Sequence, residues 1–530
     1  MVREHQITST VRGLLNARRC ASSPWATWAK LKGGLSSAWS HLNGDYRMIG
    51  FNCRLALLVV AVYFTSCATH ATAACSGSSP LWTAASASRT DVSDCVTAAS
   101  TGDTIRVPAG SETWASTLSI AKSVSVIGAG SSSTLITNGG FALTNGYTIR
   151  ISGFGFTDSH ITLGGKADLT HPFRIDHNSF TATGSKVTMV WNGNSQTPMR
   201  QPYGLFDNNT LYNYRIDIYA AAAQLNENNT QSQMWTLNPT FGTGTGAVYV
   251  EDNNVTITAP ATGNWLDFEV GTCGVARFNT FTDTHFEVHG VQSGVNRGGR
   301  CWEFYHNTRH IGGGADFFGM AFVRAGSGFV FGNRLDSGTN PFYLNLQRST
   351  GDVGAPAGQC NGTSLWDGNT PGQSGYPCRD QLGRVKDNVL WTHTPGDAYA
   401  QNLVPAYFWD NIVGASTQMI ISNHLTSATY IAENRDYYKQ SLGFDGTIGV
   451  GVGAIASRPT TCTAGVAYWA TDQGEWNTRN PGPDGQLYKC VTSNTWILHY
   501  IPYTYPHPLQ DLTNDSRPTA PTGLRITLTR

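Results

Sequence analysis

The stretch VYVEDNN at residues 248–254 decides the fold, because its pattern recurs along the chain. It reads as a short strand with apolar residues at alternate positions, and it ends on asparagine. Similar stretches end on Asn178, Asn209, Asn254, Asn279, Asn307, Asn333, Asn388, Asn411 and Asn434. Most neighbours in this series are 23 to 31 residues apart, with longer gaps before Asn254 and Asn388. Such a period predicts a solenoid in which each repeat is one coil.

The composition favours a β protein without a general affinity for polyanions. The 530 residues include 35 basic and 35 acidic side chains, so the formal net charge is zero, and only 13% of residues are charged. An average globular protein has about 25%. We therefore expect binding neither to nucleic acid nor to an anionic membrane surface. The 58 glycines and 11% aromatic residues are typical of a turn-rich β fold with a large core.

Short strands separated by glycine, asparagine and serine leave no room for crossover helices, so each coil is predicted to be β. Asparagine tolerates a left-handed bend, and its side-chain amide can bond to the equivalent amide one coil away. In this pattern the chain resembles the pectate-lyase-like superfamily of right-handed parallel β-helices over residues 76–450. DVSDCVTAASTGDTIRVPAG at 91–110 is similar to the superfamily's helical end cap. A β-sandwich or propeller is the alternative, although a 25-residue repeat is short for a four-stranded blade.

The fold prediction is therefore an all-β, right-handed parallel β-helix with an N-terminal helical cap and a small C-terminal β cap. MIGFNCRLALLVVAVYFTSCATHATAA at 48–74 is typical of a secretory signal peptide, which predicts a secreted monomer with no membrane anchor after cleavage. The expected parts are a non-native or leader extension at 1–47, the signal peptide at 48–74, the β-helix at 75–455, an aromatic-rich disulfide-bonded β cap at 456–510, and a linker or the start of a lost module at 511–530.

Eight of the eleven cysteines follow the expected cleavage site, and an even number in an exported chain favours disulfides. Pairing between sequence neighbours predicts Cys75–Cys95, Cys273–Cys301, Cys360–Cys378 and Cys462–Cys490. No pair has the spacing of a zinc site. Two long insertions, at about 210–245 and 335–385, are expected to form loops over one face and to wall a binding groove.

The resemblance implies that a substrate groove runs along the strand preceding each asparagine-terminated one. The expected groove strands are 160–165, 186–193, 214–220, 265–270, 286–290, 320–325 and 342–348. Alternation places Ile216, Ile218, Leu266, Phe268, Val270, Phe286 and Val288 inside. It leaves Arg215, Asp217, Tyr219, Asp267, Glu269, Glu287, His289, Arg324, Asn345 and Gln347 outside, on coils about 4.8 Å apart.

A row of carboxylates, arginines and a histidine suits an acidic polysaccharide. β-Elimination at a uronic acid needs neutralisation of the carboxylate, a base for the C5 proton and an acid for the leaving oxygen. We expect Asp217, Asp267, Glu269 and Glu287 to hold Ca²⁺ or substrate. The resemblance implies an arginine or lysine base beside calcium, and Arg324 is our choice, assisted by His289 and Arg215. Tyr219, Trp191, Trp265 and Asn345 are expected to contact sugars, and Lys166, Lys186 and Lys386 are further candidates for the base.

Two other functions remain open. Asp267 and Glu287 could be the carboxylate pair of a glycoside hydrolase. The chain could also be a non-catalytic β-helix that serves adhesion or filament formation, since an outward charge on such a fold is most often only solvated. The calcium-binding and catalytic stretches of the main pectate lyases and polygalacturonases are not matched. FRIDHN at 173–178 is similar to part of the calcium-binding stretch, but it lies on a strand away from the groove. The resemblance thus implies the fold more strongly than the reaction.

Overall fold

The computed structural model describes residues 74–193, 200–221, 229–258, 263–291, 296–313, 318–337, 340–346, 376–392, 401–416, 421–423 and 430–511. All of these belong to one of the two compact units into which the chain divides, Thr72–Arg530. The expected leader extension, nearly all of the expected signal peptide, and residues 512–530 lie outside the described residues.

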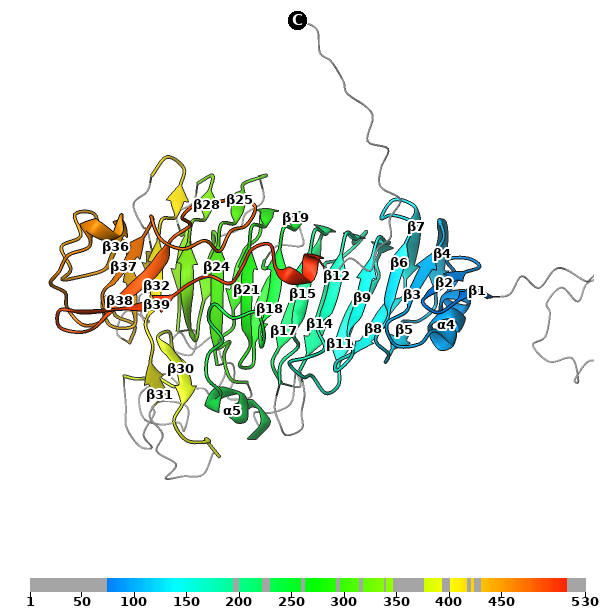
Figure 1. Ribbon diagram of the computed structural model, residues 1–530, viewed down its shortest axis with the longest axis horizontal. Helices are drawn as coiled ribbons and strands as arrows, with labels where there is room; N and C mark the ends of the chain where they lie inside the picture. The colour runs from blue at the N-terminus through cyan, green and yellow to red at the C-terminus, as the bar shows by residue number, and fades with distance from the viewer. Residues whose placement is uncertain are drawn as a thin grey trace, which may run out of the picture. The chain divides into compact units, whose positions relative to one another are not determined.

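The described part is a right-handed parallel β-helix, as the sequence predicted (Figure 1). Three long sheets run along the helix axis, and the chain visits them in the same order in each coil. We call them sheet A, sheet B and sheet C. Apart from the terminal β1–β2 hairpin, neighbouring strands within these sheets pair in parallel, each with a strand of the next coil.

Sheet A has 13 strands within the described residues. They are β1 Cys75–Ser78, β2 Leu81–Ala84, β3 Thr104–Val107, β6 Ser125–Gly128, β9 Ile149–Ser152, β12 Phe173–Asp176, β15 Gly204–Asp207, β18 Val248–Glu251, β21 Cys273–Arg277, β24 Cys301–Tyr305, β27 Ser327–Phe331, β32 Ala406–Trp409 and β35 Tyr437–Lys439. Sheet B has ten. They are β4 Gly110–Trp114, β7 Thr134–Asn138, β10 Gly155–Thr157, β13 Ser179–Thr181, β16 Thr210–Tyr212, β19 Asn254–Thr256, β22 Thr280–Thr282, β25 Thr308–His310, β28 Arg334–Leu335 and β33 Ile412–Val413.

Sheet C also has ten strands, and it contains all seven of the expected groove strands. They are β5 Leu118–Ile120, β8 Gly140–Thr144, β11 His160–Gly164, β14 Val187–Asn192, β17 Tyr214–Tyr219, β20 Leu266–Glu269, β23 Phe286–Val288, β26 Ala321–Val323, β29 Phe342–Leu344 and β34 Ile421–Asn423. The inward side chains of the three sheets form one continuous apolar core.

A ladder of buried asparagines joins the coils at the corner between sheets A and B. Its members are Asn178, Asn209, Asn253, Asn279, Asn307, Asn333 and Asn411. Asn253 is typical: its side-chain amide donates to Asn279 Oδ1 at 3.0 Å and to the carbonyl of Phe206 at 3.0 Å. Its backbone N–H also donates to Asn279 Oδ1, at 3.1 Å. The six amides from Asn178 to Asn333 therefore bond both to the next rung and to the backbone of the previous coil.

The structure corrects two details of this prediction. The sharp bend is made by the residue before each ladder asparagine, such as His177 at φ 55° and Asp252 at φ 59°. The ladder member in the opening stretch is thus Asn253, whereas Asn254 begins β19 with an exposed side chain. Asn388 and Asn434 are absent from the hydrogen-bonded ladder among the described residues. Asn388 follows β30 within an insertion, and Asn434 accepts a bond from the Gly449 N–H.

Helix α4, Arg89–Ala98, covers the N-terminal end of the core, where the sequence predicted a helical cap. Its N-cap Ser88 accepts a hydrogen bond from the backbone N–H of Asp91, which satisfies one free donor of the first turn. Val92, Cys95 and Val96 form its buried face. The cap shields the first coil from edge-to-edge pairing.

The long insertions both leave the β-helix at the corner between sheets C and A, on the lower side of Figure 1. The first lies between Tyr219 and Val248 and contains α5, Asn229–Thr236. The second contains the antiparallel hairpin of β30, Arg384–Asp387, and β31, Gln401–Leu403. Both begin later than the sequence suggested, because 210–219 and 342–344 form regular strands. Buried Arg297 connects them: it bonds to Asp380 and Asp387 and lies over the ring of Trp235.

Three of the four predicted disulfides are present: Cys75–Cys95, Cys273–Cys301 and Cys462–Cys490. Cys378 is also disulfide-bonded, while its predicted partner Cys360 lies outside the described residues. The first disulfide attaches α4 to the terminal strand β1, and the second joins equivalent positions of adjacent coils.

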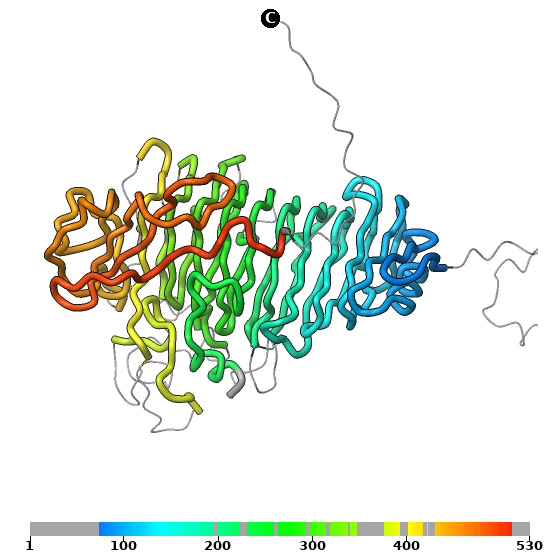
Figure 2. The backbone as a smooth tube through the Cα atoms, in the orientation of Figure 1, coloured from blue at the N-terminus to red at the C-terminus, as the bar shows by residue number. Residues whose placement is uncertain are grey.

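The C-terminal segment forms a sheet and then a strap. The sheet consists of β36 Val450–Gly453, β37 Ala467–Ala470, β38 Gln486–Thr492 and β39 Thr495–Tyr500, and 3-10 turns occur at η3 Ile455–Ser457 and η4 Pro508–Asp511. The strap, residues 501–511, runs back across the outer face of sheet A (Figure 2). Arg277 donates to the carbonyls of Tyr503 and Thr504, at 2.6 and 2.9 Å. The segment therefore covers a sheet face as well as the end of the β-helix.

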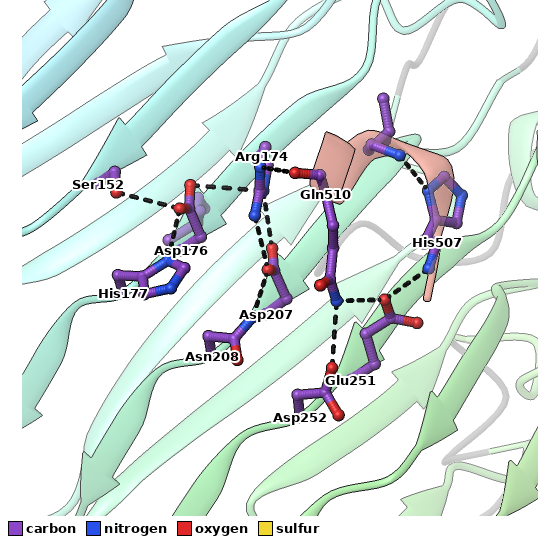
Figure 3. A network of polar contacts seen from close by, with 12 residues as sticks. Ser152, Arg174, Asp176, His177, Asp207, Asn208, Glu251, Asp252, His507 and Gln510 are labelled. Atoms are coloured by element: carbon purple, nitrogen blue, oxygen red, sulfur yellow. Dashed lines mark hydrogen bonds and ion pairs between the residues drawn. The ribbon is translucent and has the colours of Figure 1, made fainter. Parts of the chain in front are cut away.

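The end of the strap is held by a polar network on sheet A (Figure 3). The side chain of Gln510 and the backbone N–H of His507 both donate to Glu251, at 2.7 and 2.9 Å. Arg174 bonds to the Gln510 carbonyl at 3.0 Å and to the Asp207 carboxylate. The charges of this network are paired with one another and with strap backbone, so it is best understood as an anchor.

Glu303 lies between the end of β39 and the first insertion and is only 2% exposed. It accepts hydrogen bonds from the Tyr500 hydroxyl and, at 2.8 Å, from the Gly242 N–H. Burial raises the pKa of Glu303 to about 7, even though these two hydrogen bonds and Arg277 act in the opposite direction. The folded protein therefore takes up a proton at Glu303 at a higher pH than the unfolded chain does.

Asn253→Ala should destabilise the protein strongly, because it leaves buried donors and acceptors of two coils without partners. We expect a loss of about 3 kcal/mol in the free energy of unfolding, measured by urea denaturation. Asn254→Ala, at the adjacent exposed position, is the matched control and should change stability by less than about 0.5 kcal/mol. Equal losses in the two variants would contradict the assignment of Asn253 to the ladder.

Glu303→Gln should remove a pH dependence of stability. Since the folded pKa of Glu303 is about 7 against an ordinary value of 4.5, its contribution to stability is complete below pH 4.5 and falls as pH rises to 7. Urea denaturation at pH 4.5 and pH 8 should show wild type losing up to about 3 kcal/mol more than the variant across this window. Glu112→Gln, on the exposed face of β4, should leave the wild-type dependence intact. If Glu303→Gln keeps the wild-type dependence of stability on pH, Glu303 is not the source of that dependence.

Candidate active site on sheet C

The outward residues of sheet C line up as the sequence predicted. Asp217 pairs in register with Asp267, and Asp267 pairs with Glu287 on the next strand. A second row begins with Tyr219 opposite Glu269. Backbone bonds from His289 N–H to the Phe268 carbonyl and from Arg324 N–H to the Val288 carbonyl, both 3.0 Å, continue this row over two more coils.

The inward residues confirm the alternation with one exception. Ile216, Ile218, Leu266, Phe268, Phe286 and Val288 all belong to the main core. Val270 was expected there too, but it follows the end of β20 with φ 50° and packs in a separate apolar cluster with Tyr219 and Met234 of α5. The period-two rule fails at this position because the strand has already ended.

The structure brings seven of the predicted site residues into one charged cluster, which consists of Arg215, Asp217, Asp267, Glu269, Glu287, His289 and Arg324. At its centre, Arg215 forms ion pairs with Asp217, with Asp267 at 2.9 Å and with Glu269 at 3.6 Å. Its side chain keeps 24% exposure, whereas Asp267 is fully buried. The cluster therefore has a buried floor and a partly accessible cationic centre.

His289 and Arg324 form the other half of the cluster. His289 Nδ1 lies 3.1 Å from Asp267, 3.6 Å from Glu287 and 2.6 Å from Arg324 Nη2. Arg324 also forms an ion pair with Glu287. One nitrogen cannot both donate to Asp267 and accept from Arg324. We assign the donation to Asp267, because several carboxylates surround the imidazole and favour its protonated form.

Mutual interactions spread the pKa values of these groups. Burial opposes ionisation of Asp267, but His289, Arg215 and Arg324 outweigh it and lower the pKa of Asp267. Burial raises the pKa of Glu269, and the neighbouring Asp267 and Asp217 add to the rise. Burial and Arg324 lower the pKa of His289, yet Glu269 and Asp267 outweigh them and raise it overall. The site thus holds Asp267 as an ionised carboxylate next to Glu269, which keeps its proton up to a pH closer to neutral.

The structure adds Asn264 to the site and supports the position of Lys186 near it. Asn264 is buried, and its side-chain amide donates to Asp267 at 3.0 Å and to Glu287 at 2.7 Å. Lys186 Nζ donates to the Asn264 carbonyl at 3.1 Å, and burial, together with Arg215, lowers the pKa of Lys186. Asn264 precedes its strand, so strand alternation could not indicate it. The run NWLDFEV, with a polar residue before a groove strand, was the only signal.

The predicted sugar-binding residues divide into two groups. Trp191 and Trp265 are fully buried in the core, which corrects their assignment as stacking platforms. Alternation along β14 turns Trp191 inward with Met189, and Trp265 comes before β20 begins. Tyr219 and Asn345 do lie beside the charged cluster, each 7% exposed. Two further aromatic side chains, Phe322 and Tyr343, lie on the outer face in register with Glu287, and Phe322 is only 8% exposed.

The donor set fits a divalent cation that prefers oxygen. Asp217, Asp267 and Glu269 can each offer one oxygen, and these three atoms lie within 4.8 Å of one another. A second group, Asp267, Glu287 and His289, has the same property but includes a nitrogen. Oδ1 of Asp267 is buried and has no hydrogen-bond partner among the described residues. The first group suits Ca²⁺ best, provided that the guanidinium of Arg215 swings away from the carboxylates that it now contacts.

Two of the cavities that the described residues form lie at the surface of the β-helix. One, of about 360 Å³, lies on sheet C and ends at Val190 and Asn192, next to the charged cluster. The other, of about 790 Å³, opens at the corner of sheets A and B and is lined by residues such as Arg106, Ser152 and His177. Its lining includes no member of the charged cluster. The chemistry therefore points to the sheet C cavity, although it is the smaller of the two.

No family model, no curated protein and no solved structure matches this chain. Within the part of the chain that the structure describes, no helix is both long enough and apolar enough to cross a membrane. Any inference about function therefore rests on the charged cluster and its surroundings.

Ca²⁺ should stabilise the protein through Asp217, Asp267 and Glu269. At a free Ca²⁺ concentration 100 times Kd, we expect a gain of about 2.7 kcal/mol in the free energy of unfolding, measured by urea denaturation, with Kd obtained by calorimetry. Asp217→Asn should weaken binding, and the double variant Asp217→Asn with Glu269→Gln should abolish it. Asp336→Asn, an exposed position following β28, serves as the control. Unchanged affinity in the double variant would exclude this cation site.

Proposed function

We propose that the chain is a secreted polysaccharide lyase that cleaves a uronic-acid-containing polysaccharide, of pectate or alginate type, by Ca²⁺-assisted β-elimination. It would then be a distant member of the pectate-lyase-like superfamily. The observation that carries the proposal is the charged cluster itself. Four carboxylates, one histidine and two arginines gather on one outer face of a chain in which only 13% of residues are charged.

Export is supported by the disulfides. Three are present among the described residues, and such bonds persist mainly in oxidising compartments. They agree with the signal peptide that the sequence predicts at 48–74. A secreted enzyme would meet polysaccharide directly, which fits a site on an open sheet face.

The reacting sugar needs its carboxylate neutralised before its C5 proton becomes acidic. Asp217, Asp267 and Glu269 would hold Ca²⁺, which when bound supplies positive charge to the uronate carboxylate. Arg215 has partial exposure and lies among these carboxylates, so it is placed to bind the same carboxylate directly. These groups lower the energy of the enolate-like charge that develops when the proton leaves.

Arg324 is the proposed base. It is 3% exposed, and its Nε is buried without a hydrogen-bond partner among the described residues. For this step Arg324 would first give up a proton to solvent; its neutral guanidine then takes the proton from C5, the electron pair of the C5–H bond forms the C4–C5 double bond, and the C4–O bond breaks. His289, protonated beside Asp267, donates a proton to the leaving oxygen. Lys186 is the alternative base, since burial lowers its pKa.

A glycoside hydrolase is the second candidate, and one observation favours it. The pKa of Asp267 is lowered while that of neighbouring Glu269 is raised, which is the division of roles between a nucleophile or base and an acid. The hydrolase, however, gives no role to the arginines and the lysine that surround the pair. A non-catalytic adhesive β-helix would likewise give the charged cluster no chemical role.

Arg324→Ala should abolish most of the activity. Incubation of wild-type protein with polygalacturonate, alginate or a glycosaminoglycan should yield products with the ultraviolet absorbance of the new double bond. The variant should lower kcat by on the order of 10³-fold, the usual effect of losing a general base. Arg334→Ala, at an exposed position on sheet B, should leave the rate unchanged.

The same assay distinguishes the candidates. New reducing ends without ultraviolet absorbance would support the hydrolase and overturn the lyase. If no polymer gained new chain ends, the non-catalytic adhesive β-helix would be the remaining candidate. Activity that survives a strong chelator would count against the role of Ca²⁺ but not against elimination as such.

A further inference from the structure

Among the described residues, no charged side chain lines the cavity of about 360 Å³ on sheet C. It runs over β5, β8, β11 and β14 and is lined by Ser119, Ala142, Leu143, Thr144, Thr162, Leu163, Gly164, Gly165, Val190 and Asn192. The basic residue nearest to it in the chain, Lys166, lies in the loop at its rim together with the acidic Asp168. The floor therefore offers hydroxyl, amide and small apolar groups only.

This cavity leads directly into the charged cluster. Val190 pairs in register with Asp217, and Asn192 pairs with Tyr219. A chain of sugars lying along the helix axis advances across strands about 4.8 Å apart, which is similar to the length of one sugar ring. The sugars before the reacting one would accordingly lie over β14, β11 and β8, in the uncharged cavity.

The opposite flank of the cluster is aromatic. Phe322 and Tyr343 follow Glu287 in register on the next two strands, with ring centroids 5.6 Å apart. Phe318 stacks on Phe322 at 4.2 Å and is 5.5 Å from Tyr343. Aromatic faces bind the apolar faces of sugar rings but supply no positive charge for a carboxylate. Among the described residues, the cavity flank thus offers no cation to a neighbouring uronate, whereas at the aromatic flank Arg324 of the charged cluster lies 5.2 Å from the centre of the Phe322 ring.

We infer that the substrate is a heteropolysaccharide in which each uronate is flanked by neutral sugars, so that only one carboxylate at a time lies over the charged cluster. This inference rests on the proposed lyase function and narrows its substrate class. A uronate homopolymer would place carboxylates over the uncharged cavity, where no cation among the described lining residues offsets their desolvation. Neutral sugars find partners for their hydroxyl groups at Thr144, Thr162 and Asn192, and an aromatic contact at the half-buried Tyr343, because Phe322 is only 8% exposed and is stacked against Phe318.

The test compares elimination rates on two pairs of polymers. Hyaluronan and a rhamnogalacturonan backbone alternate a uronate with a neutral sugar, whereas polygalacturonate and polymannuronate contain uronate alone. We expect kcat/KM, measured by ultraviolet absorbance, to be at least tenfold higher for one of the alternating polymers than for either homopolymer. Tyr343→Ala should raise KM for that polymer about tenfold with little change in kcat.

A gain-of-charge variant tests the cavity itself. Thr162→Lys places a cation on the cavity floor and should shift the ratio of kcat/KM toward homopolymers about tenfold. Thr181→Lys, at an exposed position on sheet B, is the matched control and should not shift it. A wild-type preference for either homopolymer, or an unshifted ratio in Thr162→Lys, would overturn this inference and leave the lyase function standing. The absence of ultraviolet-absorbing product from all four polymers would overturn the lyase function and this inference with it.

Discussion

The buried asparagine ladder is the interaction on which the rest of the structure depends. The amides from Asn178 to Asn333 bond to the next amide and to the backbone of the previous coil, so a slip of one residue would leave several buried polar groups without partners. A slip would also turn every side chain of a strand to the opposite face. The ladder therefore fixes the register of sheet A, and through the short turns it fixes sheets B and C as well.

The register on sheet C has a chemical consequence. Asp217, Asp267 and Glu287 come from three coils and are far apart in sequence, yet parallel pairing places them side by side. Burying these charges is unfavourable unless they are paired, and Arg215, His289 and Arg324 supply that pairing. Orphaned atoms such as Asp267 Oδ1 and Arg324 Nε show that the pairing is incomplete among the described residues. A ligand that enters this partly open site can supply the missing partners.

Sheet A illustrates the other fate of outward charges. Arg174, Asp207 and Glu251 also come from neighbouring coils, but there the C-terminal strap bonds to Arg174 and Glu251 through Gln510 and His507, and Arg174 in turn pairs with Asp207 (Figure 3). The same repeat thus produces two rows of charges with different roles. One row anchors a segment of the chain itself, and the other remains beside an open cavity.

The sequence by itself determined the coil, the three confirmed disulfides and the membership of the charged cluster. Those features follow from local rules: the period of the asparagines, the spacing of the cysteines and the alternation of a strand. The tertiary structure alone decided what lies where a strand ends or a loop returns. Trp265 and Val270 do not follow the alternation because they flank β20. Asn264, which also precedes this strand, reaches the site through its bond to Asp267. The strap on Arg277 and Glu251 joins residues more than 200 positions apart, and no local pattern specifies such a contact.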